Sequence, residues 1–322
     1  MNNIENCMNA SSQISFYKND SRANDIFVKR DDKIGPDFGG NKARKLEYFF
    51  EDINNKKVNY IVTYGSTHSN HCRLTASYAA QFDLSCLLIL AEPEQEPEYN
   101  GNFFLYDLLD AEITYTSVDS VEETISNELE RLKSEGYNPY FIPGGGHGNL
   151  GTEAYVEASR EIKYQEEDMN IYFDYIFFAS GTGTTQAGLV IGNEIYDIAE
   201  EIIGISIARE EERGRKIIGE SIKEYCDENE ISMGDINKKI NFVTDFIGDG
   251  YGDTKLEVKR VIKKVAKKEG IMLDPIYTGK AFYGMQEYIR KNDIKDQNIL
   301  FIHTGGIPII FNHTEEFKNF QE

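Results

Sequence analysis

Residues 175–188 read YIFFASGTGTTQAG, an apolar run that passes directly into a turn of glycines and threonines. Glycine lets the backbone curl so that successive N–H groups point at one anion, and threonine hydroxyls add further donors. A helix that begins after the turn would add the partial positive charge of its N-terminus. We interpret Gly181, Thr182, Gly183, Thr184 and Thr185 as a phosphate-binding loop, although an ordinary tight turn explains them equally well.

The loop differs from two common nucleotide motifs. No lysine follows its last glycine, and the spacing G-x-G-x-x-x-x-G misses the dinucleotide fingerprint. A phosphate without a nearby lysine or arginine suits a cofactor that is anchored covalently elsewhere. Lys42, which follows Gly39-Gly40-Asn41 at the start of a predicted helix, is the candidate attachment point. Lys280 has a similar setting after a glycine, and the competing interpretation of either lysine is a surface residue.

The flanking sequence has the rhythm of a parallel sheet. Short runs rich in β-branched and aromatic residues alternate with helix-length segments whose apolar positions repeat every 3.6 residues. Strands are predicted at 26–29, 60–63, 85–90, 113–115, 175–178, 202–206 and 299–303, and helices at 41–51, 71–82, 102–109, 120–135, 152–164 and 185–197. The pattern predicts an α/β protein with helices on both faces of an open, parallel-rich sheet.

Several predicted strands end in glycine-rich or small polar turns. Besides the opening loop, these are GGNKARK at 39–45, YGSTHSNH at 64–71 and PGGGHGNLG at 143–151. Ligands bind at the carboxyl ends of the strands in such sheets, so we expect one site to collect these turns. The glycine run at 144–148 is a candidate domain crossing, with a plain strand-to-helix turn as the alternative.

Charge and composition exclude several classes of protein. The 322 residues include 34 Lys+Arg and 55 Asp+Glu, and the net charge of -21 disfavours a nucleic-acid partner. The basic stretch 255–268 has apolar residues at helical spacing, which predicts an amphipathic helix. The four cysteines form no C-x-x-C pair and the histidines are scattered, so we expect no metal. Without a signal peptide or long apolar run, we expect a cytoplasmic protein with no membrane contact.

Polar residues in the remaining turns are candidates for chemistry. Ser69 and Asn70 are explained by a helix cap, but Asn70 could donate to a phenolate oxygen and Ser69 could move a proton. Tyr251 in GDGYGD and Tyr277 in DPIYTG stand in turns where core packing explains a phenol poorly, so both are acid/base candidates. Thr304 follows the last predicted strand and could contact a ring nitrogen without protonating it.

Seven segments in this order resemble the family of D-cysteine desulfhydrase and 1-aminocyclopropane-1-carboxylate deaminase. They are VKRDD at 28–32, GGNKARKLEY at 39–48, SNHCR at 69–73, IPGGG at 142–146, ASGTGTTQAG at 179–188, LDPIYTGKA at 273–281 and HTGG at 303–306. The resemblance implies a fold-type II pyridoxal 5'-phosphate (PLP) enzyme, similar to the tryptophan synthase β chain. It implies a large domain from residues 1–52 and 161–322, a small domain from 53–160, and a homodimer.

The resemblance also implies roles for individual residues. Lys42 matches the family's Schiff-base lysine, the loop at 181–185 its phosphate cup, and Asn70 the partner of the cofactor's 3'-oxygen. Ser69 matches the residue beside the substrate, and Tyr251 and Tyr277 match the two active-site phenols. Lys280 matches a position that is not the Schiff base.

Two positions bear on the substrate. Thr278 stands where the ring-opening deaminases of the family carry glutamate, and together with Thr304 it resembles the desulfhydrase branch. His68 departs from the family, which usually has glutamine in this segment near the substrate carboxylate. We therefore expect α,β-elimination from D-cysteine or a related small amino acid, such as a sulfonated or chlorinated alanine. The alternatives are a 1-aminocyclopropane-1-carboxylate deaminase, a PLP- or amino-acid-binding protein without catalysis, and a nucleotide-binding α/β protein.

Overall fold

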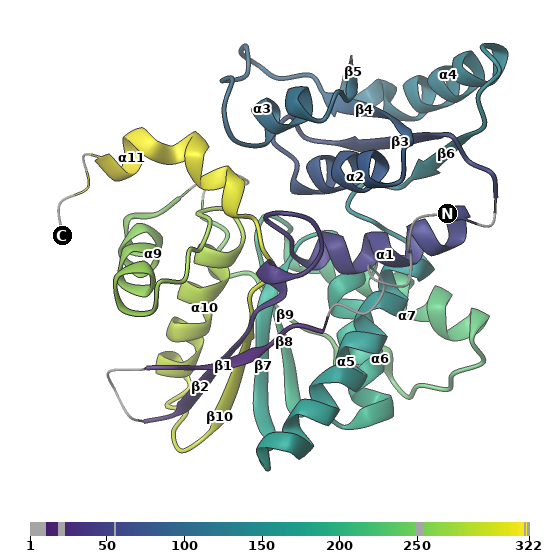
Figure 1. Cartoon of the computed structure of the whole chain (residues 1–322). Coiled ribbons are helices and arrows are strands. Elements are labelled where there is room, and N and C mark those ends of the chain that lie inside the picture. Colours follow the sequence, from purple (N-terminus) through teal and green to yellow (C-terminus); the bar gives the residue numbers. More distant parts are fainter. Residues whose placement is uncertain (1–10, 19–22, 55, 249–253, 319, 321–322) are drawn as a thin grey trace.

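Two parallel-rich sheets form the framework of the protein (Figure 1). The computed structural model describes residues 11–18, 23–54, 56–248, 254–318 and 320. The larger sheet has the order β1-β2-β10-β7-β8-β9, and the smaller has the order β5-β4-β3-β6. Only the β1–β2 pair is antiparallel among the described strands. The predicted α/β class with open parallel-rich sheets is therefore confirmed.

The strands and helices alternate along the chain. The strands are β1 (Ile14–Tyr17), β2 (Asp25–Lys29), β3 (Tyr60–Gly65), β4 (Ser85–Ala91), β5 (Glu112–Thr116), β6 (Pro139–Ile142), β7 (Phe173–Ser180), β8 (Ala199–Ser206), β9 (Asn241–Val243) and β10 (Asn298–Ile302). The α-helices are α1 (Asn41–Asn54), α2 (Asn70–Gln81), α3 (Gly101–Leu108), α4 (Val121–Ser134), α5 (Asn149–Met169), α6 (Thr184–Tyr196), α7 (Glu211–Glu228), α8 (Ile236–Lys239), α9 (Leu256–Glu269), α10 (Thr278–Lys291) and α11 (Thr314–Lys318). Short 3-10 helices are η2 (Asp31–Lys33), η3 (Val118–Ser120) and η4 (Ile307–His313).

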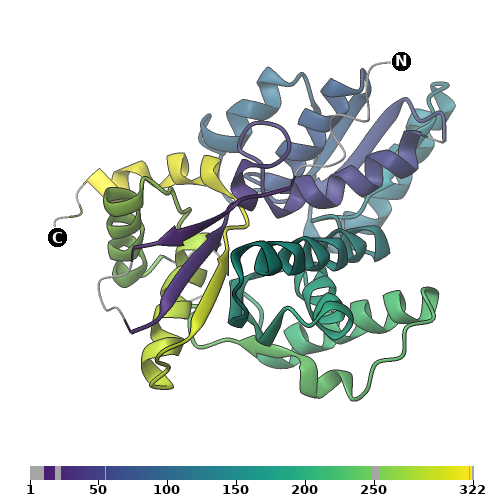
Figure 2. The same cartoon turned by 60° about the horizontal axis from the view of Figure 1, so that its bottom comes forward.

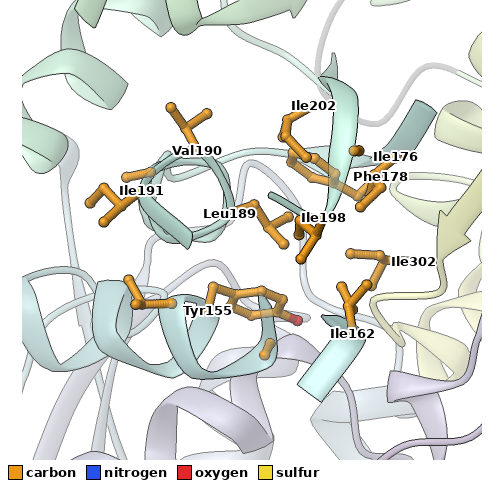
Figure 3. Close-up of a cluster of buried hydrophobic side chains, with 14 of the residues drawn as sticks. Tyr155, Ile162, Ile176, Phe178, Leu189, Val190, Ile191, Ile198, Ile202 and Ile302 are labelled. Carbon is orange, nitrogen blue, oxygen red and sulfur yellow. The ribbon is translucent and has the colours of Figure 1, made fainter. Parts of the chain in front are cut away.

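The central strand β7 is buried on both faces. Phe178 packs on one face with Tyr155 of α5 and Leu189 of α6, in the cluster drawn in Figure 3. Its neighbour Phe177 faces the other side, in a second core with Phe282 of α10. Successive side chains of a strand point to opposite faces, so a continuous apolar run is what a sheet covered by helices on both sides requires.

Every strand and helix predicted from the sequence is present within a few residues of its expected bounds. The basic stretch at 255–268 is α9, whose buried face includes Val258, Val261, Ile262 and Val265. The sequence did not indicate the short strands β1, β6 and β9, nor the helices α7, α8, α10 and α11. A strand of three or four residues carries too few apolar positions to show a period.

Helix α10 was hidden because Pro275 stands just before it and its first turn contains Gly279, both typical of a loop. The Asp274 carboxylate accepts the backbone N–H groups of Tyr277 (2.7 Å) and Thr278 (2.9 Å), so it satisfies donors at the helix N-terminus. A Cβ on Gly279 would lie 2.6 Å from the Asp274 carbonyl oxygen and 2.7 Å from Ile262 of α9. The glycine therefore permits close packing of α10 on its neighbours.

The division into two domains stays our proposal. Helix α1 packs its apolar face into the core of the smaller sheet, with Phe49 and Phe50 in one cluster with Ile61 and Leu88. Figure 2 shows α1 between the smaller sheet with its helices and helix α5. Residue 160 lies inside α5, which packs on α6 of the larger sheet, so we propose that the second crossing precedes α5.

A buried network of charges ties α1 to the larger sheet. The Arg44 guanidinium of α1 donates to Asp31 (2.9 Å) and lies 2.8 Å from Glu161 of α5, which also accepts from Lys29 (2.6 Å). The Tyr155 hydroxyl donates to Asp31 at 2.7 Å. Burial alone would raise the pKa of Asp31, but Arg44, Lys29 and the hydrogen bond from Ser12 outweigh it and lower that pKa to about 2.

We expect Asp31→Asn to destabilise the protein by about 3–5 kcal/mol, because it leaves buried Arg44 and Lys29 short of a partner. Since the folded pKa of Asp31 lies below its ordinary value of 3.8, its contribution to the free energy of unfolding is present above pH 3.8 and is lost as the pH falls to about 2. Urea denaturation across this pH range measures both effects. The exposed Asp168→Asn is the matched control. Equal stability of the two variants would contradict the assignment.

Candidate active site

One large cavity, of about 960 Å³, lies at the carboxyl ends of strands from both sheets. Its walls include residues that follow β3, β6, β7, β8 and β10. They comprise Tyr64, Gly65, Ser66, Pro143, Gly144, Gly145, Gly181, Thr182, Gly183, Ile207, Ala208, Arg209, Thr304, Gly305 and Gly306. The turns that the sequence assigned to a common site are therefore gathered at one cavity.

The glycine-threonine loop opens α6 as predicted. Gly183 has a φ of 100° and Thr184 begins the helix, so the first N–H groups of α6 lie at the cavity. Gly181, Thr182, Gly183 and Thr185 line the cavity, whereas Thr184 is fully buried beside it. The arrangement has the form that binds a phosphate at a helix N-terminus.

A cation does lie at this loop, contrary to our expectation of a phosphate without one. The Lys45 ammonium donates to the Thr184 hydroxyl at 2.5 Å, from a position 139 residues earlier in the chain. Burial lowers the pKa of Lys45 well below its ordinary value, and the charge of Lys42 adds to the decrease. A bound phosphate would supply the anion that this buried ammonium lacks. The sequence missed it because only the packing of α1 against α6 brings it to the loop.

Lys42 stands at the same cavity on the first turn of α1. Its amine donates to the Gly145 carbonyl oxygen at 3.0 Å. A Cβ on Gly145 would lie 3.3 Å from that amine and 3.3 Å from the Thr182 hydroxyl, so amine and loop flank one glycine. Burial lowers the pKa of Lys42 to about 8, and the charge of Arg209 contributes. The amine is therefore readily available in its neutral, nucleophilic form.

Close backbone contact between two glycine pairs holds Lys42 beside Thr304. Gly40 forms a β-bridge with Gly305, and the Asn41 N–H donates to the Thr304 carbonyl oxygen at 3.1 Å. A Cβ on Gly40 would lie 2.4 Å from that oxygen, and one on Gly305 would lie 2.4 Å from the Gly39 carbonyl oxygen. Glycine is required at both positions because no side chain fits between the two backbone segments.

The positions of Ser69 and Asn70 fit both interpretations, the helix cap and the functional site. Ser69 is the N-cap of α2 and accepts the Cys72 N–H at 3.2 Å, while its side chain also lines the cavity. The Asn70 side-chain oxygen accepts from Asn102 at 2.8 Å. That bond orients the amide so that its nitrogen would lie 3.4 Å from a Cβ on Gly306 in the cavity wall. Asn70 thus presents a donor to a ligand.

Of the two predicted phenols, the structure describes Tyr277 and not Tyr251. Tyr277 lines the cavity at the start of α10, and Asp274 fixes its backbone. Tyr251 lies outside the described residues. Thr278 is fully buried, its hydroxyl donates to Asp274 at 2.6 Å, and it does not line the cavity. Lys280 is buried and donates to the Ile207 and Ile247 carbonyl oxygens at 3.2 and 2.7 Å.

His68 does not line the cavity. Its ring lies 3.2 Å from the Asn312 amide nitrogen and packs against Phe103 of α3. The histidine that replaces the family's usual glutamine therefore changes a contact between the 66–69 turn and η4. Ser66 lines the cavity instead. Direct contact between His68 and a substrate stays a prediction without support from this geometry.

Two further cavity residues had no signal in the sequence. Arg209 follows β8, and His147 follows the glycine run at 144–146. Burial lowers the pKa of His147, and the charges of Lys45, Lys42 and Arg209 add to the decrease, so His147 lies near three basic side chains. Within the described residues, no group of three His, Cys, Asp or Glu side chains could hold a metal ion. No described helix is both long and apolar enough to cross a membrane.

A phosphorylated aldehyde fits this cavity on two observations. The loop before α6 and the buried Lys45 ammonium suit a phosphate, and the neutral form of Lys42 suits attachment of an aldehyde. The loop before α6 and Lys42 line one cavity, and they flank Gly145. The residues present therefore fit pyridoxal phosphate.

The comparisons with known proteins agree with this chemistry. The family model described as "Pyridoxal-phosphate dependent enzyme" matches residues 13–305. A putative 1-aminocyclopropane-1-carboxylate deaminase of Pyrococcus abyssi is 36% identical over 91% of this chain and 87% of its own. A D-cysteine desulfhydrase of Serratia proteamaculans is 33% identical over 89% and 88%. The crystal structure of an "ACC deaminase homologue" has a TM-score of 0.86 at 35% identity, covering 97% of this chain and 94% of that one. The chain therefore belongs to the pyridoxal-phosphate dependent enzymes of fold type II, in the group that includes 1-aminocyclopropane-1-carboxylate deaminases and D-cysteine desulfhydrases.

Proposed function

We propose that the enzyme catalyses α,β-elimination from D-cysteine or a similar β-substituted alanine, with pyruvate, ammonia and sulfide or another leaving group as products. The observation that carries the proposal is the wall around Thr304. No acidic side chain of the described residues lines the cavity there, and the glutamates that do line it come from residue 210 and helix α7. A neutral hydroxyl beside a ring nitrogen leaves that nitrogen unprotonated, which favours prompt departure of a β-substituent.

When bound, pyridoxal phosphate supplies the electron sink that makes the α-proton of an amino acid acidic. We propose Lys42 as the general base, whose amine would accept the α-proton of the substrate. The depressed pKa of about 8 keeps part of the amine neutral at physiological pH. The cavity wall at Gly145 and Thr182 confines the amine to one position.

The remaining residues orient the reactants. The loop at 181–185 and Lys45 would hold the phosphate, and Asn70 would donate to the cofactor's 3'-oxygen. Ser69 lies beside the substrate and Tyr277 moves a proton at the reacting carbons; both side chains line the cavity. We propose the same catalytic role for Tyr251. This arrangement converts a reaction between separate molecules into one within a single complex.

The ring-opening 1-aminocyclopropane-1-carboxylate deaminase is the second candidate. It is favoured by the names of relatives that are 36–38% identical, slightly above the 33–34% of the desulfhydrases. A protein that binds the cofactor or an amino acid without catalysis is the third. The homodimer and the cytoplasmic location expected from the sequence stay predictions.

We expect the PLP-loaded protein to release equal amounts of sulfide and pyruvate from D-cysteine, and no 2-oxobutanoate from 1-aminocyclopropane-1-carboxylate. Lys42→Ala should lower the rate by at least about a thousand-fold, because it removes both the attachment point and the base. The exposed Lys267→Ala is the control. Formation of 2-oxobutanoate alone would favour the second candidate, and absence of any keto acid would favour the third.

The rate at which apoprotein reloads with pyridoxal phosphate should depend on the neutral fraction of Lys42. Because its pKa is lowered from 10.5 to about 8, the rate should rise with pH and level off above about pH 8. Stopped-flow absorbance measures the rate, with free Nα-acetyl-lysine as the reference amine. A rate that keeps rising towards pH 10.5 would show that the amine is not perturbed.

Lys45→Met should weaken binding of pyridoxal phosphate by roughly 10- to 100-fold, since a charge-assisted hydrogen bond contributes about 1.5–3 kcal/mol. Binding of pyridoxal, which lacks the phosphate, should change little. Equilibrium dialysis of apoprotein with each ligand gives the comparison. If both ligands are weakened equally, Lys45 supports the fold and does not contact the phosphate.

A further inference from the structure

A buried arginine on α2 has no part in the reaction proposed above. Arg73 is 2% exposed, and its Nε donates to the Asn102 side-chain oxygen at 3.4 Å. Its Nη1 and Nη2 donate to the carbonyl oxygens of Asp37 and Phe38 at 2.7 and 2.6 Å. It forms no ion pair with a carboxylate of the described residues, and burial lowers the pKa of Arg73 to about 10. A charge is costly to bury among neutral oxygens, so the three bonds indicate a specific role.

These contacts fix the orientation of the Asn102 amide. A guanidinium can only donate hydrogen bonds, so the Asn102 oxygen faces Arg73. A backbone carbonyl can only accept, and that of His68 lies 2.8 Å from the Asn102 nitrogen. The same nitrogen also donates to the Asn70 side-chain oxygen, at 2.8 Å. Asn102 is fully buried, so its amide cannot turn over without losing all three bonds.

The orientation of Asn102 decides which end of the Asn70 amide faces the cavity. The Asn70 oxygen is taken by Asn102, so the nitrogen of this cavity-lining side chain is the end that remains for a ligand. A turned amide would present its oxygen instead, and that oxygen would repel a phenolate. The order of bonds from Arg73 to Asn102 to Asn70 therefore places a donor at the site.

The other two donors of Arg73 hold the turn that leads into α1. Phe38 has a φ of 56°, a left-handed conformation that a bulky residue rarely adopts, and it is 43% exposed, so packing does little to stabilise it. The bonds from Arg73 to the carbonyl oxygens of Asp37 and Phe38 supply that stabilisation. Lys42 follows four residues later. One guanidinium thus contacts both the turn before the amine and the side chain that orients Asn70.

We propose that Arg73 and Asn102 are positioning residues of the active site. Asn102 keeps the donor end of the Asn70 amide toward the cofactor's 3'-oxygen, and Arg73 keeps Asn102 in that orientation. Arg73 also ties this donor to the turn before Lys42. The inference rests on the proposed contact of Asn70 with the cofactor, and it adds two residues that do not line the cavity themselves.

Asn102→Asp tests the orientation with an almost isosteric change. A carboxylate has no N–H group, so it still accepts from Arg73 but can no longer donate to Asn70. The Asn70 amide should then turn, donate to the new carboxylate and present its oxygen to the cofactor. Asn127→Asp, the same change at an exposed residue of α4, is the matched control.

The measurement is binding to apoprotein by equilibrium dialysis, with pyridoxal phosphate and with its 3-deoxy analogue, which lacks the 3'-oxygen. Asn102→Asp should weaken binding of pyridoxal phosphate relative to the analogue by roughly 10- to 100-fold, since a charge-assisted hydrogen bond is lost. Asn127→Asp should leave this ratio unchanged. A general loss of stability weakens binding of both ligands alike and cancels in the ratio.

A second variant covers the case in which Asn102→Asp does not fold. Arg73→Lys keeps the positive charge but removes the planar fork of donors, so Asn102 is held less firmly. The variant should lower the same ratio by a smaller factor. In the loaded protein, both variants should move the pH midpoint of the cofactor's visible absorbance upward, because an oxygen that has lost its donor is more basic.

An unchanged ratio in both variants would overturn the inference, since Arg73 and Asn102 would then support only the fold. Asn70→Ala separates this result from a failure of the proposed contact. If Asn70→Ala alone lowers the ratio, Asn70 binds the 3'-oxygen without help from the other two residues. If Asn70→Ala also leaves the ratio unchanged, the contact and the inference are both wrong. The proposed elimination is tested separately, by keto-acid release.

Discussion

The active site depends on the contact between Gly40 and Gly305. The start of the first long helix and the end of the last strand approach so closely there that a Cβ on either glycine would meet a backbone carbonyl oxygen at 2.4 Å. The bridge joins segments more than 260 residues apart and places Lys42 beside Thr304. Without it, Lys42 and the cavity wall around Thr304 would belong to separate parts of the molecule.

Buried charged residues also hold α1 in position, on the face of the helix that meets the larger sheet. Arg44 is held by Asp31 and Glu161 on the face of the helix that meets the larger sheet. Lys45, the next residue, reaches Thr184. One helix therefore contributes the Lys42 amine, the Lys45 contact to the loop before α6 and the Arg44 anchor, and the VKRDD and GGNKARK segments act as one structural unit. Burial of these charges is tolerated because each finds a partner or a ligand.

Electrostatics distinguishes the cavity from the rest of the protein. The chain as a whole carries a net charge of -21, but Lys42 and Arg209 line the cavity, and Lys45 contacts the loop before α6 beside it. The phosphate of the cofactor would bring negative charge to these basic side chains. Burial and the charge of Arg209 lower the pKa of the Lys42 amine to about 8, so the cationic surroundings also make this amine more reactive.

The sequence by itself determined the class of fold and most strands and helices, and it predicted which residues carry the family's chemistry. It could do so because hydrophobic period, glycine-rich turns and collinear motifs are local properties of the chain. It also predicted that Lys42, Asn70 and the loop at 181–185 share a site, since strand ends of a parallel sheet gather at one edge. Only the tertiary structure decided that Lys45 reaches the loop before α6, that Arg209 lines the cavity, and that His68 and Thr278 do not line it. Those positions depend on how helices pack across long distances in sequence, and no local pattern records such packing.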